Sequence, residues 1–361
     1  MILTLAACGG GEAAPPASRE ILVLGVMGTS DSENPVIVGM INGVRQAVAE
    51  YNGNPDSRYE IELREFNTQA TPGEAGAGES EIANTERLIG VVGPFALAEV
   101  ESLAPAFESS GLPYVLPSVT GAGIPQDGWR NFRRLVADDR DEGRLLAAHA
   151  AGRVAGAIAL VTEDSGEGRP FAEGARAELE RLQRPPGRTD TIDPGSNPTA
   201  LAQALVRAAP EAVLYGGGGA TGKALLDALR QAEFQGLTVA SHQMRDLHPE
   251  GVGGGVVSSS AGSDPAAESS SRFAGRYRNR FDSQPTAFSL EAYEGALMLL
   301  EAVEEVQGNL NAITDFLAAN RMFRGDSKNY EFDDRGEPVN PPIWIYESTN
   351  GGWRLADRVE A

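Results

Sequence analysis

The sequence predicts an α/β protein with two lobes, each a doubly wound, mostly parallel sheet flanked by helices. The first observation is length, because 361 residues exceed what one simple hydrophobic core usually serves. The second is that short apolar runs typical of buried strands alternate with amphipathic helical segments. The third is that this alternation begins near residue 20 and starts again near residue 139. The restart indicates two copies of one architecture.

The first strand–loop–helix unit shows the pattern most clearly. Residues 21–26 read ILVLGV, an apolar run typical of a strand buried on both faces. A loop of small and polar residues follows over 28–35, and apolar residues then recur at helical spacing from Met40 to Tyr51. Ligands of open α/β sheets bind beyond the carboxyl ends of the strands, where this loop lies. An ordinary strand–helix unit with a solvated loop has the same pattern.

The other elements are expected in the following order. In the first half, strands are predicted at 59–67, 88–93, 114–117 and 132–136, with a helix through 100–107. In the second half, strands are predicted at 157–161, 212–215, 237–240 and 256–259, and helices from 139 and through 171–182, 199–209 and 222–232. Two longer helices through 273–281 and 288–300 come next, and a β-hairpin over 343–355 ends the chain.

The charge balance limits the partners. With 51 acidic and 30 basic residues, the chain has a formal net charge of −21. A nucleic-acid partner requires a basic surface that displaces counterions, so we expect none. The same argument excludes a broad electrostatic attachment to anionic lipid.

The single cysteine, Cys8, is informative through its surroundings. The sequence LAACGG at 5–10 resembles the lipobox of bacterial lipoproteins, in which the cysteine receives a diacylglyceryl group. Seven residues before Cys8 are fewer than a complete signal peptide has. Residues 9–18 are rich in Gly, Ala and Pro and suit a flexible tether. We therefore expect lipidation at Cys8 and attachment to the outer face of the bacterial cell membrane, with no membrane-spanning segment.

From about residue 20 to its end, the chain resembles the type I periplasmic binding proteins. The resemblance is to the branched-chain amino acid (leucine/isoleucine/valine) binding proteins of ABC importers in particular. It rests on the order and spacing of short matches over nearly the whole chain. These are residues 21–28, GVVGP at 90–94, GLP at 111–113, PSVT at 117–120, YGG at 215–217 and AYEGA at 292–296.

The resemblance implies two lobes that close on a ligand by hinge motion. Residues 1–18 would be the signal remnant and tether, 19–137 with 263–342 the first lobe, and 138–262 with 343–361 the second. Crossovers would lie near 137–138, 261–262 and 342–343. The ligand would be a small polar molecule, an amino acid or related compound, and the partner an ABC permease. The protein would be a monomeric, extracytoplasmic solute receptor.

The resemblance also implies a set of ligand-binding residues. In the family, small hydroxyl residues and backbone N–H groups of the first lobe hold the ligand carboxylate. Ser118 and Thr120 occupy such positions here, and the other carboxylate-facing loop, which usually carries serine, reads Phe95, Ala96, Leu97. In the second lobe the corresponding positions are Glu167, Gly218 and Gln243. His242 is added from its own place after a predicted strand.

One of these positions departs from the family in its charge. Gln243 stands where the family has the acid that pairs with the ligand ammonium. An ammonium buried without a countercharge is costly. Either Glu167 supplies the charge from a different direction, or the ligand is not an α-amino acid.

Two other functions are considered beside this one. Residues 217–223 read GGGATGK and match the Gly-x4-Gly-Lys of a nucleotide-binding loop, but the next residue is Ala224 where Ser or Thr holds Mg²⁺. A nucleotide-binding enzyme is therefore the alternative from another class. A ligand-sensing receptor module not coupled to transport is the third possibility.

Catalytic and metal-binding patterns give no support to an enzyme. No Gly-x-Ser-x-Gly elbow is present, and the three histidines lack the spacing of a zinc motif. The charged run at 138–142, DDRDE, is expected to be a solvated helix start favoured by the helix dipole. We expect no catalytic residue, no metal and no cofactor.

Overall fold

The structure is a computed structural model of the chain. It describes residues 19–67, 80–124, 129–245, 254–265, 267, 270–326, 328–349 and 352–360. The predicted lipidation site Cys8 and the tether lie outside the described residues. Within the described part of the chain, no helix is both long and apolar enough to cross a membrane.

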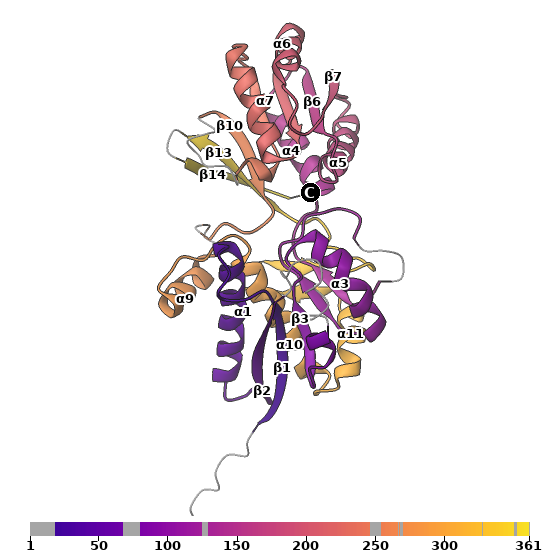
Figure 1. Cartoon of the computed structure of the whole chain (residues 1–361), viewed down its shortest axis with the longest axis vertical. Coiled ribbons are helices and arrows are strands. Elements are labelled where there is room, and N and C mark those ends of the chain that lie inside the picture. Colours follow the sequence, from indigo (N-terminus) through magenta and orange to yellow (C-terminus); the bar gives the residue numbers. More distant parts are fainter. Residues whose placement is uncertain are drawn as a thin grey trace, which may run out of the picture.

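The first sheet contains five strands, all parallel, in the spatial order β2-β1-β3-β4-β5. Their bounds are β1 Glu20–Met27, β2 Tyr59–Phe66, β3 Leu88–Val92, β4 Tyr114–Leu116 and β5 Phe132–Arg134. The last six residues of β1 are buried, as its uninterrupted apolar run predicts for a strand covered on both faces. This sheet forms the lower body in Figure 1.

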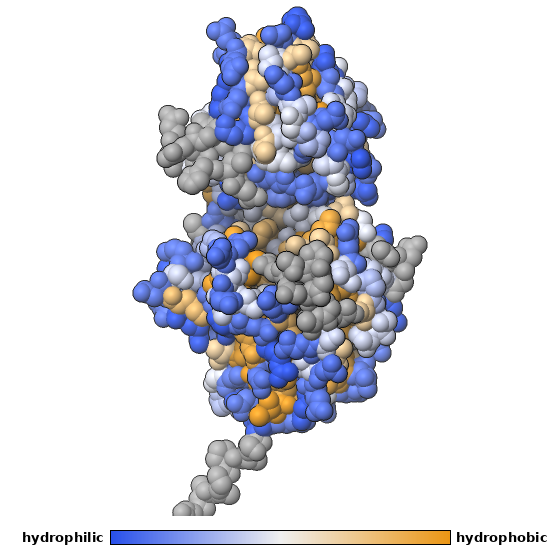
Figure 2. All heavy atoms as spheres, in the orientation of Figure 1, coloured by the Kyte–Doolittle hydropathy of each residue, from blue (hydrophilic) through white to orange (hydrophobic). Residues whose placement is uncertain are grey.

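The second sheet contains seven strands in the order β14-β13-β10-β9-β8-β6-β7. Five are parallel: β6 Ile158–Glu163, β7 Arg188–Ile192, β8 Ala212–Gly216, β9 Leu237–Ala240 and β10 Val256–Ser260. The hairpin of β13 Ile343–Thr349 and β14 Gly352–Val359 joins the β10 edge antiparallel. Figure 1 shows this sheet in the upper body, and Figure 2 shows the largely hydrophilic surfaces of the two bodies on either side of a narrower waist.

Helices cover both sheets. The first sheet is flanked by α1 Pro35–Gly53, α3 Leu97–Ser110, α9 Ser271–Phe281, α10 Ser289–Glu305 and α11 Leu310–Ala319. The second is flanked by α4 Asp139–Arg153, α5 Gly168–Arg181, α6 Thr199–Ala208 and α7 Gly219–Gln231. A short 3-10 turn, η1 His242–Met244, follows β9. The two-lobed, doubly wound fold is thereby confirmed.

The chain passes between the two sheets three times. It leaves the first sheet after β5 and enters α4 at Asp139. It leaves the second sheet after β10, since α9, α10 and α11 pack in the core of the first body. It returns at β13 after the small antiparallel ribbon of β11 Met322–Arg324 and β12 Asn329–Glu331. The sequence analysis did not predict β7, α11 or this ribbon.

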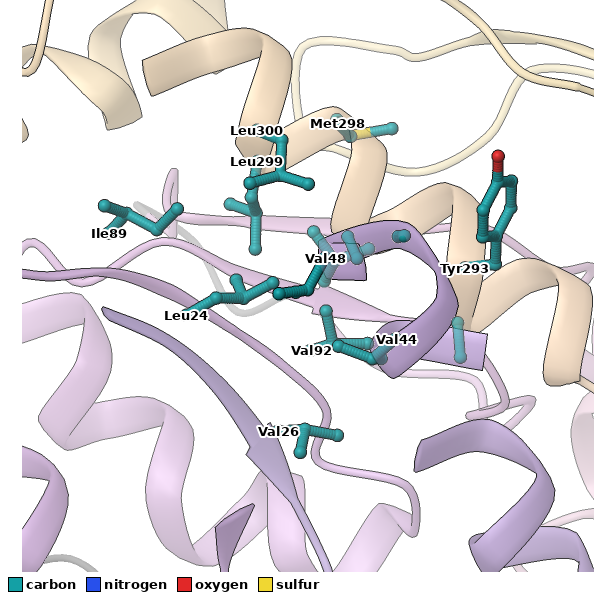
Figure 3. Close-up of a cluster of buried hydrophobic side chains, with 14 of the residues drawn as sticks. Leu24, Val26, Val44, Val48, Ile89, Val92, Tyr293, Met298, Leu299 and Leu300 are labelled. Atoms are coloured by element: carbon teal, nitrogen blue, oxygen red, sulfur yellow. The ribbon is translucent and has the colours of Figure 1, made fainter. Parts of the chain in front are cut away.

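The core of the first body brings α1 and α10 together over the sheet. Asn34 begins α1 by accepting a hydrogen bond from the backbone N–H of Val36 at 2.9 Å, and Pro35 follows at the first helical position. Figure 3 shows side chains of α1, α10, β1 and β3 converging in this core. Ten of them are labelled there: Leu24, Val26, Val44, Val48, Ile89, Val92, Tyr293, Met298, Leu299 and Leu300.

Close approach of the two helices requires a glycine on α1. A Cβ atom at Gly43 would lie 2.2 Å from the carbonyl oxygen of Ser289, which opens α10. Gly43→Ala is therefore expected to force the helices apart and to lower the free energy of unfolding by about 1–3 kcal/mol. Urea denaturation measures this change.

Gly53→Ala on the same helix is the matched control. Nothing lies within 4 Å of the Cβ position of Gly53, so the free energy of unfolding should stay equal or rise slightly. Equal stability of the two variants would contradict the packing described here.

Candidate functional site

Side chains and loops at the carboxyl ends of β6, β8 and β9 form a small pocket together with the start of α4. In a parallel sheet these strand ends meet at one edge, which is the edge where α/β proteins bind ligands. The pocket is lined by Asp139, Glu142, Glu167, Phe171, Gly217, Ser241, His242 and Gln243. Three of the residues predicted from the sequence, Glu167, His242 and Gln243, therefore lie together.

Asp139 is the most unusual residue of this pocket. Its side chain is 1% exposed, and neither carboxylate oxygen has a hydrogen-bond partner of acceptable geometry among the described residues. Burial, and after it the neighbouring Glu142, raises the pKa of this carboxyl to about 7, although His242 and the Thr120 side chain oppose the shift. A buried acceptor without a donor is costly, so this carboxylate is stabilised by taking up a proton or by a donor that reaches it.

Glu142, by contrast, is fully satisfied inside the second lobe. It accepts hydrogen bonds from the backbone N–H of His242 at 2.6 Å and from the Ser259 hydroxyl, and lies 3.0 Å from His242 Nδ1. These contacts, with His242 foremost, lower the pKa of Glu142 against the effect of burial. The group formed by Asp139, Glu142 and His242 also has ligand atoms within 4.8 Å of one another, a spacing that suits a cation.

The predicted character of residues 138–142 is wrong for two of the five residues. The run was expected to be a solvated helix start, and Asp138 does cap α4 by accepting from the Asp141 N–H at 2.8 Å. Asp139 and Glu142, however, are buried at 1% and 4% exposure. The reason is that α4 begins at the crossover, so one side of its first turn faces the second sheet and the pocket.

The glycine-rich loop at 217–223 does not have the arrangement of a phosphate-binding loop. The Glu163 carboxylate accepts the Gly218 N–H and, at 2.8 Å, the Thr221 hydroxyl. Lys223 pairs with Asp227 at 2.6 Å. A carboxylate already occupies the donors that a phosphate would need, and it would repel that anion. Gly218 lies beside Gln243, since a Cβ atom at this glycine would be 3.6 Å from the Gln243 Oε1 atom. Gly218 itself does not line the pocket.

The predicted residues of the first lobe form a second group. The Ser118 hydroxyl donates to the Phe95 carbonyl at 2.9 Å. The backbone N–H groups of Phe95 and Ala96 donate to the Glu99 carboxylate at 3.2 and 3.3 Å. Leu97 packs against Gly121, where a Cβ would lie 2.6 Å from the Leu97 Cδ2 atom. Loops 94–97 and 118–121 are therefore packed on each other.

One backbone contact joins the two groups. The Asp139 N–H donates to the Thr120 carbonyl at 2.8 Å. Arg134, fully buried, holds the Thr120 loop by donating to the carbonyls of Val119, Gly121 and Ile124 at 2.8, 2.8 and 3.0 Å. Thr120 thus lies against the first turn of α4, and the first-lobe loops border the pocket through it.

Sequence reasoning missed several pocket residues. Asp139, Glu142, Phe171, Gly217 and Ser241 were not assigned to the site, and neither was Glu99. The burial of Asp139 could have been suspected from its place at the predicted crossover, because a residue there has a sheet on one side. Nothing in the sequence distinguishes buried Glu142 from exposed Arg140 two residues earlier.

Two mostly parallel sheets, three chain crossings and a pocket beside the crossings define a two-lobed solute receptor. The model of the periplasmic binding protein family matches residues 23–352, and the chain belongs to that family. Its members act outside the cytoplasm. The fold is that of the branched-chain amino acid binding proteins of ABC transporters.

Similarities in sequence and structure agree with this family. The chain is 23% identical over 280 residues to the leucine-, isoleucine-, valine-, threonine- and alanine-binding protein of Pseudomonas aeruginosa, covering 71% of this chain and 70% of that one. A substrate-binding protein of Desulfitobacterium hafniense in complex with leucine has a TM-score of 0.80 and 16% identity, covering 93% and 100% of the two chains. The branched-chain amino acid substrate-binding protein of Streptococcus pneumoniae in complex with isoleucine has a TM-score of 0.74 and 17% identity, covering 95% and 100%.

The raised pKa of Asp139 predicts how stability depends on pH. A carboxyl whose pKa rises from 3.8 to about 7 on folding binds its proton more tightly in the folded state. Stability of the unliganded protein therefore falls as pH rises from about 4 to about 7, by on the order of a few kcal/mol in total. Asp139→Asn should make this fall smaller, which urea denaturation at pH 5 and pH 8 measures.

Part of the pH slope should remain, because Glu337 has its pKa raised to about 7 by burial as well. Asp138→Asn is the control: asparagine caps a helix as well as aspartate does, so this variant removes a neighbouring charge, keeps the cap and should keep most of the slope. An unchanged slope in Asp139→Asn would show that the folded state does not hold this carboxyl in the buried position.

Proposed function

We propose that this protein is the extracytoplasmic solute-binding component of an ABC importer and binds one small polar ligand between its lobes. The ligand is an amino acid or a related compound. The observation that carries the proposal is the buried, unpartnered carboxylate of Asp139 in a pocket next to the chain crossings. Such a group is stabilised when a ligand donor reaches it.

The ligand contacts are divided between the lobes. In the first lobe we propose Phe95, Ala96, Leu97, Ser118 and Thr120, and in the second Glu167, Gly218, His242 and Gln243, with Asp139 added. The lobes comprise residues 19–137 with 263–342, and 138–262 with 343–361. Closure of these lobes by hinge motion at the three crossings would enclose the ligand.

We propose Asp139 as the acid that pairs with the ligand ammonium in place of Gln243. The sequence has no acid at the family's ammonium-pairing position, and Glu167 was the suggested replacement. Glu167 is exposed at the pocket, whereas Asp139 is buried in it. A buried carboxylate attracts a cation more strongly than an exposed one, because solvent screens it less.

Attachment and partners follow from the same proposal. Lipidation at Cys8 would anchor the protein to the outer face of the membrane through the tether at 9–18. A monomer in the closed form would dock on the permease. A sensor of ligand occupancy would have the same pocket, and nothing in the described residues favours sensing over import. Nucleotide-dependent catalysis is disfavoured by Glu163 inside the glycine-rich loop.

A thermal-shift screen of the protein tests the function. The panel contains amino acids, short amides, aliphatic amines, aromatic acids, sugars and Mg-ATP. A ligand of the folded state at 100 times its Kd stabilises by about 2.7 kcal/mol, so at least one small solute should raise Tm. Thr120→Val in the first lobe and Glu167→Gln in the second should each reduce that rise.

Exposed residues provide matched controls, since Thr189→Val on β7 and Glu173→Gln on α5 should leave the rise unchanged. A rise in Tm that survives both site variants would place the ligand elsewhere. Stabilisation by Mg-ATP alone, abolished by Lys223→Ala, would replace the proposal with the nucleotide-binding alternative.

A further inference from the structure

We infer that strand β13 is a brace that holds the two lobes in an open arrangement. Two aromatic side chains on one face of the strand, Trp344 and Tyr346, contact segments of the first lobe, and closure of the lobes breaks these contacts. The inference rests on the proposed function, because hinge closure is part of it. It adds residues that set the balance between open and closed lobes without contacting the ligand.

The two aromatic residues lie on an unusual face of β13. This strand begins directly after the third crossing, and its side chains alternate between the two faces of the second sheet. Ile343 and Ile345 pack in the core cluster of the second lobe, whereas Trp344 and Tyr346 lie outside that cluster on the opposite face. They are nevertheless only 2% and 4% exposed. Segments of the first lobe contribute to this burial.

Tyr346 contacts the end of the second crossing. Its hydroxyl donates a hydrogen bond to the Asp264 carboxylate at 2.6 Å, and Asp264 lies where the chain has left β10 and runs toward α9 of the first lobe. The guanidinium carbon of Arg245 lies 3.5 Å from the centre of the Tyr346 ring. Arg245 follows the proposed ligand residue Gln243 by two positions, so Tyr346 lies between the pocket and the crossing.

Trp344 contacts the approach to the third crossing. The Lys328 ammonium lies 5.3 Å from the centre of the Trp344 ring and 4.8 Å from that of Tyr330, both within the range of a cation–π interaction. The same ammonium lies 3.7 Å from the Glu291 carboxylate, which is fully buried on α10. Figure 1 shows β13 in the upper body and α10 in the lower body, so this contact joins the two lobes.

Glu291 also fixes the second crossing to the first lobe. It accepts hydrogen bonds from the Ser263 N–H at 2.8 Å and from the Ser263 hydroxyl at 2.6 Å. Ser263 directly precedes Asp264, the partner of Tyr346. One carboxylate of α10 therefore positions both first-lobe groups that β13 contacts, and these groups move with the first lobe.

The arrangement that these contacts hold is open. All eight residues that line the pocket beside Asp139 belong to the second lobe. The first-lobe loops 94–97 and 118–121, which carry the other proposed ligand residues, do not line it. Closure has to bring these loops over the pocket by rotation about the crossings, and that rotation displaces Lys328 and Asp264 relative to β13.

The contacts of the brace are weak enough to break when the lobes close. The Lys328 ammonium and the Trp344 Nε1 atom have no hydrogen-bond partner of acceptable geometry among the described residues, and 3.7 Å exceeds hydrogen-bonding distance. One hydrogen bond to a carboxylate or one cation–π contact changes an equilibrium constant by roughly two- to tenfold. Removing either contact should therefore raise the ratio of closed to open molecules by that factor.

Tyr346→Phe tests the brace, because it removes one hydroxyl and keeps the ring. Double electron–electron resonance is measured on the unliganded full chain carrying Cys8→Ser, with spin labels at Glu33→Cys and Gly166→Cys. Both labelled positions are exposed and follow the carboxyl ends of β1 and β6, and a Cβ atom at Gly166 would meet nothing within 4 Å. The population with a short label distance is expected to rise roughly two- to tenfold over that of the wild type.

Lys328→Met removes the second contact and should raise the same population. Two control variants alter the same chemistry inside one lobe. Tyr114 donates to Glu108 at 3.1 Å in the first lobe, and Lys223 pairs with Asp227 at 2.6 Å in the second. Tyr114→Phe and Lys223→Met should leave the distance distribution unchanged. If Tyr346→Phe does not fold in a urea titration, Lys328→Met decides.

The outcomes are separable from those of the proposed function, because the resonance measurement needs no ligand. Distance distributions of Tyr346→Phe and Lys328→Met that equal that of the wild type, or that shift to longer distances, would overturn the inference and leave the solute receptor intact. A thermal-shift screen without any stabilising compound, together with the expected shift to short distances, would contradict the proposed function and support the brace.

Discussion

The crossing from β5 to α4 is the constraint on which the site depends. Within nine residues the chain places Arg134 in the first lobe, passes between the lobes and places Glu142 in the second. The Arg134 guanidinium donates hydrogen bonds to three backbone carbonyls of the 118–124 loop, and the Asp139 N–H donates to the Thr120 carbonyl of the same loop. The residues proposed to contact the ligand are therefore positioned in both lobes relative to one short segment. The proposed hinge closure would require this segment to bend.

The surroundings of this segment explain why the pKa values of two neighbouring acids, Asp139 and Glu142, shift in opposite directions. Glu142 is buried with donors from His242 and Ser259, and its pKa is lowered. Asp139 is buried without such donors, and its pKa is raised. Glu142 therefore keeps its negative charge, whereas the charge of Asp139 depends on a ligand or a proton. An ammonium ligand and a proton would then compete for Asp139, so ligand affinity and pH are linked.

Much of the architecture could be predicted from sequence, because parallel strands buried on both faces are uninterrupted apolar runs. Residues 21–26 and 157–161 show this, and the pattern restarts after the crossing. Strand β7 was not predicted, because it lies at the sheet edge and its sequence, RTDTI, alternates charged and small residues. Helix α11 and the ribbon of β11 and β12 are short and have few buried side chains, so they leave little periodic signal.

The site was predictable only in part. Glu167, His242 and Gln243 follow strands whose carboxyl ends meet, so their meeting follows from topology. The burial of Asp139 depends on tertiary packing across the crossing, and the occupation of the Phe95 and Ala96 N–H groups by Glu99 depends on a side-chain conformation. Neither is encoded in local periodicity.

The most direct measurement is a crystal structure of the protein grown with the compound that raises Tm most in the thermal-shift screen. One molecule of that compound is expected between the lobes, with a donor atom within hydrogen-bond distance of an Asp139 oxygen. A compound bound away from the crossings, or one that makes no contact with Asp139, would contradict this.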